Sequence, residues 1–138
     1  MNIKEIQEKI DATEYWDMDI LDLSVKYFGD EISIIIYKDD NTSWKIEFLS
    51  CYKLQYETDV TWRGFPHYVR VMKKPQMGYF GQNIAISQNK DHDDLIDVSL
   101  DLSIMTLEII CKEVKVEEVK NVDIIFFWKE NEGRVDLA

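Results

Sequence analysis

The chain has 138 residues, of which 46% are hydrophobic and 12% aromatic, and this composition excludes a disordered or low-complexity protein. A single domain of this length buries about 70% of its unfolded surface in one core. The formal net charge of −11, from 27 acidic and 16 basic residues, disfavours nucleic acid and anionic membranes as partners. It favours a basic partner, with solubility alone as the competing explanation.

The N-terminal residues lack the pattern of a signal peptide, and no apolar run approaches the roughly 20 residues of a membrane span. Cys51 and Cys111 are isolated cysteines without a Cys-x-x-Cys spacing. We therefore expect a cytoplasmic protein with free, buried thiols. A disulfide between the two cysteines stays open, because it requires only that they be neighbours in the fold.

In chain order, residues 2–12 predict a short amphipathic helix. Asn2 and Glu5 have the spacing of a capping box at its start. The isoleucines of this segment share one helical face. They are Ile3, Ile6 and Ile10. A helix this short needs a sheet to pack on.

A first β half is predicted over residues 18–58, because apolar and polar residues alternate there. Gly29 permits the sharp reversal that ends its first strand. The strand over 31–38 is apolar on both faces, which predicts a central strand covered on its second face by the N-terminal helix. Trp44–Tyr56 is the clearest strand, and its length predicts that it bends or serves two parts of the sheet.

Residues 59–77 form an irregular link that holds both prolines and the chain's only concentration of basic residues. A second β half follows over 78–128. In its long strand over 104–119, the apolar residues occupy odd-numbered positions up to Cys111 and even-numbered positions from Val114. This change predicts a β-bulge near Lys112-Glu113. Val122–Trp128 is predicted as the last strand, and 131–138 as a loose tail.

The two halves echo each other. Tyr27-Phe28-Gly29 recurs as Tyr79-Phe80-Gly81, and each copy precedes an Ile-x-Ile segment. The sequence around Cys51 likewise resembles that around Cys111. We interpret these echoes as two pseudo-repeated halves, each with two short strands and one long strand.

The fold class that follows is α+β within a single domain, 1–138. The N-terminal helix packs on a strongly curved, mostly antiparallel sheet, or a partly open barrel, of seven to eight strands.

Catalytic signatures are missing from the sequence. His92 lies in an acidic turn that lacks the spacing of a calcium loop, and His67 has no partner at metal-ligand spacing. No nucleophile motif or phosphate-binding loop occurs. We therefore expect a protein that is not an enzyme and that binds neither a metal nor a cofactor.

Aromatic residues beside carboxylates are the stronger functional signal, because Trp and Tyr anchor protein interfaces and acids complement basic partners. The competing explanation is that the rings belong to the core and the acids are merely solvated. The candidate partner-binding residues are Tyr15, Trp16, Asp17, Asp19, Asp39, Asp40, Glu57, Asp59 and Trp62.

Four segments together are similar to small bacterial immunity proteins of polymorphic and contact-dependent toxin systems. They are Tyr15-Trp16-Asp17-Met18-x-Ile20-Leu21-x-Leu23, Tyr27-Phe28-Gly29-Asp30-Glu31-Ile32, Trp44-x-Ile46-x-Phe48 and Cys111-x-x-Val114-x-Val116-Glu117. The resemblance covers residues 15–120, and its motifs are structural rather than catalytic. It implies a protein that binds and blocks the C-terminal toxin domain of a sibling cell.

We therefore expect an immunity protein that occludes a basic toxin, a nuclease by preference, with an acidic and aromatic surface. It would be a monomer or a weak homodimer. Two alternatives stay open: a barrel that binds a small ligand or acts as a regulator, and a homodimeric scaffold that pairs through the edge strand Val122–Trp128.

Overall fold

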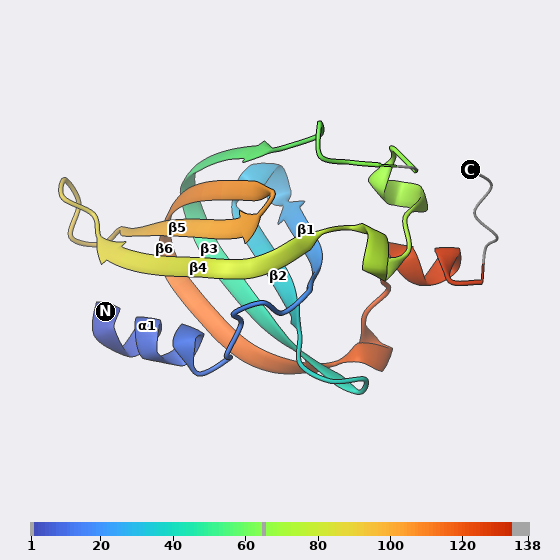
Figure 1. The fold of residues 1–138 in the computed structure, drawn as a ribbon. Coiled ribbons are helices and arrows are strands. Elements are labelled where there is room, and N and C mark those ends of the chain that lie inside the picture. The colour runs from blue at the N-terminus through green and yellow to red at the C-terminus, as the bar shows by residue number, and fades with distance from the viewer. Residues whose placement is uncertain (1, 65, 134–138) are drawn as a thin grey trace.

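The computed structural model describes residues 2–64 and 66–133, which contain one α-helix and six β-strands (Figure 1). In chain order the elements are α1 (Ile3–Asp11), β1 (Ile20–Lys26), β2 (Glu31–Tyr37), β3 (Thr42–Thr58), β4 (Tyr79–Gln88), β5 (Ile96–Ser103) and β6 (Met105–Lys120). Short 3-10 helices lie at Tyr27–Gly29, Val69–Val71, Lys74–Gln76, Asn121–Asp123 and Phe127–Asn131. Among the described residues no helix is long and apolar enough to cross a membrane.

The amphipathic helix predicted at the N-terminus is confirmed as α1. Its first turn is capped by Asn2, whose Oδ1 accepts a hydrogen bond from the backbone N–H of Glu5 at 3.1 Å. Ile10 is fully buried, and Ile3 and Ile6 pack against the same core from the edge. The helix therefore contributes an apolar face to the sheet, as its sequence pattern requires.

All six strands are antiparallel and follow the order β1-β2-β3-β6-β5-β4. Each half of the chain is a three-stranded meander that ends in its longest strand, β3 or β6. These two long strands pair from Thr42 opposite Lys120 to Thr58 opposite Met105, and so join the halves. The predicted class, a helix on a curved antiparallel sheet, is confirmed.

The Tyr-Phe-Gly echo has no structural counterpart. Tyr27-Phe28-Gly29 forms the turn between β1 and β2, whereas Tyr79-Phe80-Gly81 begins strand β4. The likeness between the halves therefore lies in the order of their strands. The Cys51 echo fits that order better, because Cys51 of β3 lies directly opposite Cys111 of β6.

The curvature of the sheet brings its two edge strands together at one point. Asp19, just before β1, forms an isolated antiparallel bridge with Phe80 of β4. The N–H of Asp17 donates to the carbonyl of Gly81 at 2.8 Å, and the N–H of Gly81 donates to the carbonyl of Met18 at 2.9 Å. Beyond this point the edges separate, so the sheet is not closed.

The sheet has six strands rather than the predicted seven to eight, because the strand predicted over Val122–Trp128 is wrong. That segment turns at a 3-10 helix, where the buried Asn121 accepts a hydrogen bond from the hydroxyl of Ser43. Trp128 then docks beside β1 and donates from Nε1 to the carbonyl of Leu21 at 3.0 Å. Alternating apolar residues serve here as anchors on the sheet, so Val122–Trp128 is not the edge strand through which a scaffold dimer was expected to pair.

The C-terminal end is attached at Asn131, the first residue of the predicted tail. Asn131 is buried, and its Nδ2 donates to the carbonyls of Arg70 and Met72 at 2.9 and 2.8 Å. Residues 134–138 of that predicted tail lie outside the described residues.

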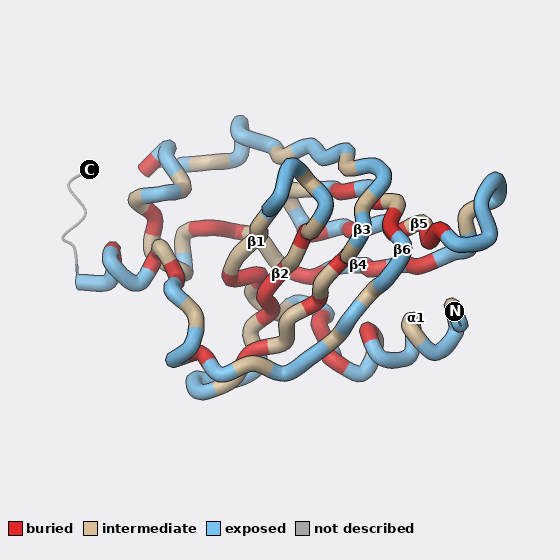
Figure 2. The backbone as a smooth tube through the Cα atoms, turned by 180° about the vertical axis from the view of Figure 1, so that it is seen from behind, coloured by how far each residue is buried: buried red, intermediate tan, exposed pale blue. Residues whose placement is uncertain are grey.

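The main core fills the inner side of the curved sheet (Figure 2). Both halves contribute fully buried side chains to it. They include Ile32, Ile34, Ile36, Ile46, Phe48, Ile84, Ile96, Leu100, Leu107 and Cys111. A side-chain-filled interior argues against a barrel that holds a small ligand, since such sites are open cavities of about 300–1,000 Å³.

Strand β2 is buried on both faces, as its sequence predicts. The prediction that the N-terminal helix covers its second face is wrong. Ile35 on its outer face packs in a second apolar cluster with Leu21, Met72, Met77, Phe126 and Trp128. The cover therefore comes from the 59–77 link and the C-terminal segment. The helix α1 packs instead on β4, at the other edge of the sheet.

Strand β3 is irregular where its core-facing residues change from even-numbered positions, such as Phe48, to the odd-numbered Cys51. Ser50 has a φ of +53°, and the pairing with β6 shifts register between Cys51 and Lys53. Tyr52 is the extra residue of this bulge. The bulge predicted near Lys112-Glu113 thus lies on the partner strand instead.

Candidate protein-binding surface

The predicted candidates Tyr15, Trp16 and Asp17 lie where β1 and β4 meet. Tyr15 is buried, and its hydroxyl accepts a hydrogen bond from the N–H of Ile84 at 2.9 Å. Burial, followed by nearby Asp11, raises the pKa of Tyr15 against the effect of that hydrogen bond. Trp16 stacks on Tyr15 with ring centroids 4.3 Å apart and stays 47% exposed. Within this group Trp16 and the exposed Asp17 are accessible to a partner, and Tyr15 is a core residue.

Asp19 and Asp40 are connected through two other side chains. Lys74 Nζ lies 3.9 Å from Asp19 Oδ2 and 4.3 Å from the ring centroid of Tyr37. The hydroxyl of Tyr37 donates to Asp40 Oδ1 at 3.2 Å, and this hydrogen bond is the main reason that the pKa of Tyr37 is raised. The basic link is therefore attached to the sheet through the contacts of Lys74 with Asp19 and Tyr37. The contact of Asp40 is with Tyr37.

Asp39 and Asp59 organise turns. Asp39 Oδ1 accepts from the N–H groups of Asn41 and Thr42 at 2.8 and 2.7 Å. Asp59 Oδ1 accepts from the N–H and the hydroxyl of Thr61 at 2.9 and 2.6 Å. These hydrogen bonds lower the pKa of both carboxyls, so both keep their negative charge.

The remaining candidates, Glu57 and Trp62, lie at the far end of β3. Glu57 is exposed, and Trp62 is 60% exposed with its ring against Gly78. Asp39 and Asp40 precede β3 and Asp59 follows it, so this 17-residue strand separates them. The structure therefore does not gather the predicted residues into one site.

A different surface combines exposure with a concentration of carboxylates. We call it the polar outer face, and it comprises the outward-facing residues of β4, β5, β6 and the second half of β3. They are Asn83, Ala85, Ser87, Asp97, Ser99, Asp101, Thr106, Glu108, Ile110, Lys53, Gln55 and Glu57. Its acids outnumber its single base, Lys53.

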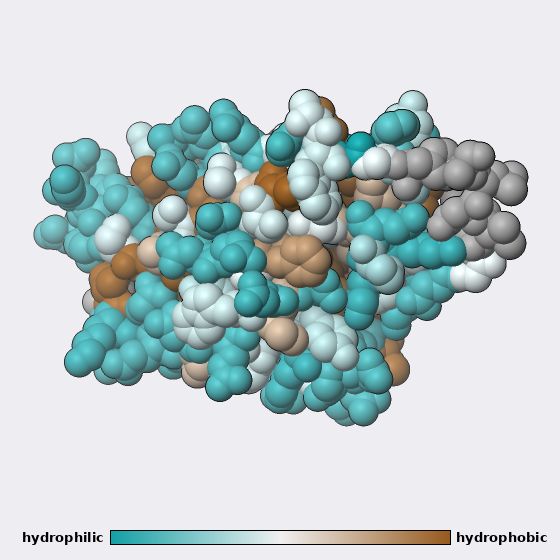
Figure 3. Space-filling view, in the orientation of Figure 1, coloured by the Kyte–Doolittle hydropathy of each residue, from teal (hydrophilic) through white to brown (hydrophobic). Residues whose placement is uncertain are grey.

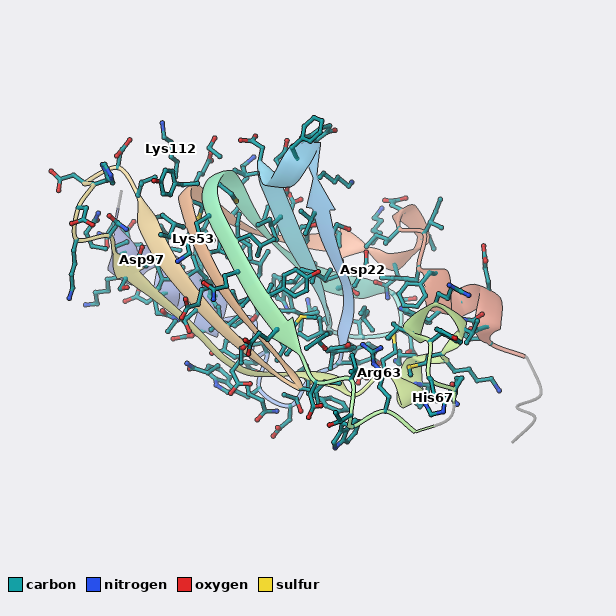
Figure 4. The ribbon with its side chains drawn as sticks, turned by 90° about the horizontal axis from the view of Figure 1, so that it is seen from above. Asp22, Lys53, Arg63, His67, Asp97 and Lys112 are labelled. Carbon is teal, nitrogen blue, oxygen red and sulfur yellow. The ribbon has the colours of Figure 1, made fainter. Side chains whose placement is uncertain are left out.

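Two shallow grooves of ≈ 520 and ≈ 330 Å³ run along the polar outer face and share Ser99 and Glu108 in their linings. Lys53 and Asp97 both border the second groove, and Figure 4 shows them over neighbouring parts of the sheet. Small side chains such as Ser99 leave the strands accessible, while the acids line the grooves. The shape is open and extended, which suits a protein partner better than a small molecule.

An aromatic turn, Tyr27–Gly29, lies at the end of the β1–β2 pair and is exposed (Figure 2). Tyr27, Phe28 and Gly29 all have positive φ, of +54°, +59° and +93°. Bulky residues rarely adopt this conformation, and it costs about 1–2 kcal/mol per residue. Phe28 is nevertheless fully exposed, so no burial of its ring offsets that cost.

The aromatic turn continues into the polar outer face. Phe28 and the exposed Tyr52 line one groove of ≈ 370 Å³, and Lys53 lines both this groove and the neighbouring one that contains Asp97. Strained backbone conformations cluster at functional sites, so the exposed ring of Phe28 makes this turn a candidate for binding. The sequence showed Tyr27–Gly29 as a motif, but it gave no sign that the ring of Phe28 is exposed.

The described residues contain no group of three His, Cys, Asp or Glu side chains that could hold a metal ion. Hydrophilic residues dominate the face in Figure 3, where hydrophobic residues show only as separate patches.

Comparison with known proteins gives one family. The family model described as "Immunity protein PIM7" matches residues 2–118. The crystal structure of an uncharacterized protein from Neisseria gonorrhoeae has 7% sequence identity, with 75% of this chain and 92% of that chain covered at a TM-score of 0.49. A search of curated proteins finds no match.

Proposed function

The chain belongs to the immunity protein PIM7 family, and from this premise we propose that it neutralises its cognate toxin through the polar outer face and the aromatic turn. Membership of an immunity family implies a toxin protein as partner. The proposal adds the binding surface and the chemical character of the toxin. It describes a stoichiometric inhibitor rather than an enzyme.

Charge supports a basic toxin domain. The chain carries a net charge of −11, and the polar outer face concentrates Glu57, Asp97, Asp101 and Glu108 around open grooves. Such a surface accelerates encounter with a basic protein and repels nucleic acid. A basic nuclease fits best, because its own substrate site must attract an anion and an acidic inhibitor can occupy that site.

The aromatic turn supplies the complementary kind of contact. Interface energy is concentrated in a few aromatic or Arg side chains, while surrounding polar contacts set orientation. Phe28 and Tyr52 stand exposed beside the polar outer face. They would insert into apolar parts of the toxin surface, with the acids pairing around them.

The two free thiols of Cys51 and Cys111 suit a reducing compartment. We accordingly place the neutralisation in the cytoplasm. A toxin that acts inside the cell would be met there.

Co-expression with the toxin domain encoded beside this chain tests the proposal. Wild-type chain should rescue growth and co-purify with the toxin domain. A variant that combines Glu57→Gln, Asp97→Asn, Asp101→Asn and Glu108→Gln should bind at least about tenfold more weakly at low salt. Its affinity should also depend less on salt than that of the wild type, because fewer charges remain to be screened.

The matched control combines Glu8→Gln, Glu14→Gln, Asp123→Asn and Glu130→Gln, which removes the same charge from exposed sites elsewhere. This control should keep near wild-type affinity. Failure of the wild type to rescue growth or to co-purify would contradict the function. Equal loss in both variants would contradict the polar outer face and leave only a general effect of net charge.

A further inference from the structure

The two edge strands of the sheet, β4 and β1, differ in how far other parts of the chain bond to their outward backbone groups. At β4, the side chain of Gln7 donates from Nε2 to the carbonyl of Ile84 and accepts at Oε1 from the N–H of Ile86, both at 2.8 Å. The hydroxyl of Tyr15 accepts from the N–H of Ile84. These side chains occupy outward backbone groups of Ile84 and Ile86, so another strand cannot pair along this part of β4.

The edge of β1 is sealed only at its start, where Trp128 donates to the carbonyl of Leu21. From Asp22 to Lys26 the strand pairs with β2 on one side. On its other side, no hydrogen bond from the described residues reaches its backbone. In an antiparallel strand every second residue directs its N–H and carbonyl away from the partner strand. Val25 is 47% exposed and β1 has only β2 as a strand neighbour among the described residues, so this edge can accept an incoming strand.

An apolar pocket of ≈ 170 Å³ opens beside this edge. Its lining includes Ile20, Leu23, Met77, Tyr79, Leu102 and Met105. A cavity of about 150 Å³ accommodates a benzene ring, so this pocket has room for one large apolar side chain. Proteins that recognise an added strand combine a free edge with such a pocket for alternate side chains.

A carboxylate marks the boundary of the pocket. Asp22 lines both the pocket and a second groove of ≈ 670 Å³ on the other face of β1. Its Oδ2 accepts from the hydroxyl of Ser24 at 3.3 Å, and no cation within the described residues pairs with it. Figure 4 shows Asp22 on β1, at the opposite end of the sheet from Asp97. A basic residue next to the inserted apolar side chain would complement this carboxylate.

We propose that Asp22–Lys26 is a strand-addition site for an extended segment of the cognate toxin, one of whose apolar side chains fills the pocket while a Lys or Arg pairs with Asp22. This inference rests on the proposed function and identifies a second element of the same recognition. The site lies directly before the aromatic turn in the chain, so one partner can contact both.

A second copy of the chain fits the edge less well. Each copy carries a net charge of −11, which opposes self-association, whereas a basic toxin is attracted. Of the two apolar residues in the open edge, Leu23 already lines its own pocket, so only the smaller Val25 could fill the pocket of another copy. The charge and the pocket therefore favour the toxin.

Amide hydrogen exchange of wild-type chain, alone and with the toxin domain, tests the site directly. We expect alternate amides within Asp22–Lys26 to become protected in the complex. The amides of Ile84 and Ile86, which are already bonded to side chains, should keep their exchange rates. A complex that neutralises the toxin without protecting β1 overturns strand addition and leaves the proposed function intact.

Charge reversal at the pocket gives an independent measurement. Asp22→Lys should weaken toxin binding at least tenfold, whereas Glu8→Lys, with the same change in net charge at an exposed position of α1, should have a much smaller effect. Equal effects would overturn the role of Asp22. Absence of toxin binding by the wild type would refute the proposed function itself. Sedimentation that shows a dimer of the chain alone, with β1 amides protected, would assign the edge to a second copy instead.

Discussion

Cys51 of β3 lies directly opposite Cys111 of β6, on paired antiparallel strands, and both are free thiols. The pair lies beside the bulge at Tyr52, where the two long strands bend. Burial raises the pKa of Cys51 to about 11, with Asp30 as the next cause, and burial raises the pKa of Cys111 to about 12, with Cys51 as the next cause. Both thiols are therefore protonated at neutral pH.

The raised pKa values of the two thiols predict slow alkylation in the folded state, because the thiolate is the reactive form. Iodoacetamide at pH 8 should modify both cysteines far more slowly in native protein than in urea, with Cys111 the slower of the two. Because both folded-state values lie above the ordinary 9.0, the thiols lower stability progressively as the pH rises from about 9 toward 11 and 12. Mass spectrometry of quenched samples measures the rates, and fast modification of native Cys111 would contradict its burial.

Tyr15→Phe tests whether the segment between α1 and β1 holds the edge strand β4 in place. The change removes the hydroxyl that accepts from the N–H of Ile84 and leaves a buried amide without a partner. We expect the free energy of unfolding to fall by about 1–3 kcal/mol in urea denaturation. Tyr56→Phe is the control, because the Tyr56 side chain is half exposed, and its loss should be within about 0.5 kcal/mol. Equal values for the two variants would mean that this hydrogen bond contributes nothing.

Gly81→Ala should disrupt the contact between the two edge strands. A Cβ at position 81 would collide with the backbone carbonyl of Tyr15, and it would also meet the Tyr15 ring at 3.0 Å. Backbone cannot move aside as a flexible side chain can, so we expect a loss of about 1–3 kcal/mol in the free energy of unfolding. Gly64→Ala is the matched control, since no atom lies within 4 Å of its Cβ and its φ is not positive. A negligible loss at Gly81 would show that the backbone around Tyr15 shifts easily.

The alternation of apolar and polar residues allowed much of the sheet to be predicted. Alternation located the clear strand that became β3 and the apolar faces of β2, because the side-chain period of a strand is directly visible in sequence. The same rule failed at Val122–Trp128, where Phe126 and Trp128 alternate but dock on the outer face of the sheet instead of joining it. Whether an alternating segment pairs or docks depends on tertiary contacts that periodicity does not contain.

The candidate surface was harder to predict, for two physical reasons. The acids of the polar outer face are spread over β3, β5 and β6, so only strand pairing brings Glu57, Asp97 and Glu108 onto one surface. Phe28 is a candidate because of its positive φ and its full exposure, and neither follows from residue type. By contrast, the clustering of rings and acids in sequence selected Tyr15, which is a core residue.

Phe28→Asn should separate stability from binding at the aromatic turn. Asn adopts the left-handed conformation more readily than Phe, and the exposed ring contributes no burial, so we expect the free energy of unfolding to rise by about 1 kcal/mol. Toxin affinity should fall about 30-fold, the effect of losing an aromatic anchor worth about 2 kcal/mol. Phe28→Ala is the control: it also removes the ring but keeps the backbone strain, so it should lose the affinity without gaining stability. Urea denaturation and calorimetric titration measure the two quantities, and an Asn variant that binds like the wild type would show that the strained turn presents its ring for some other purpose.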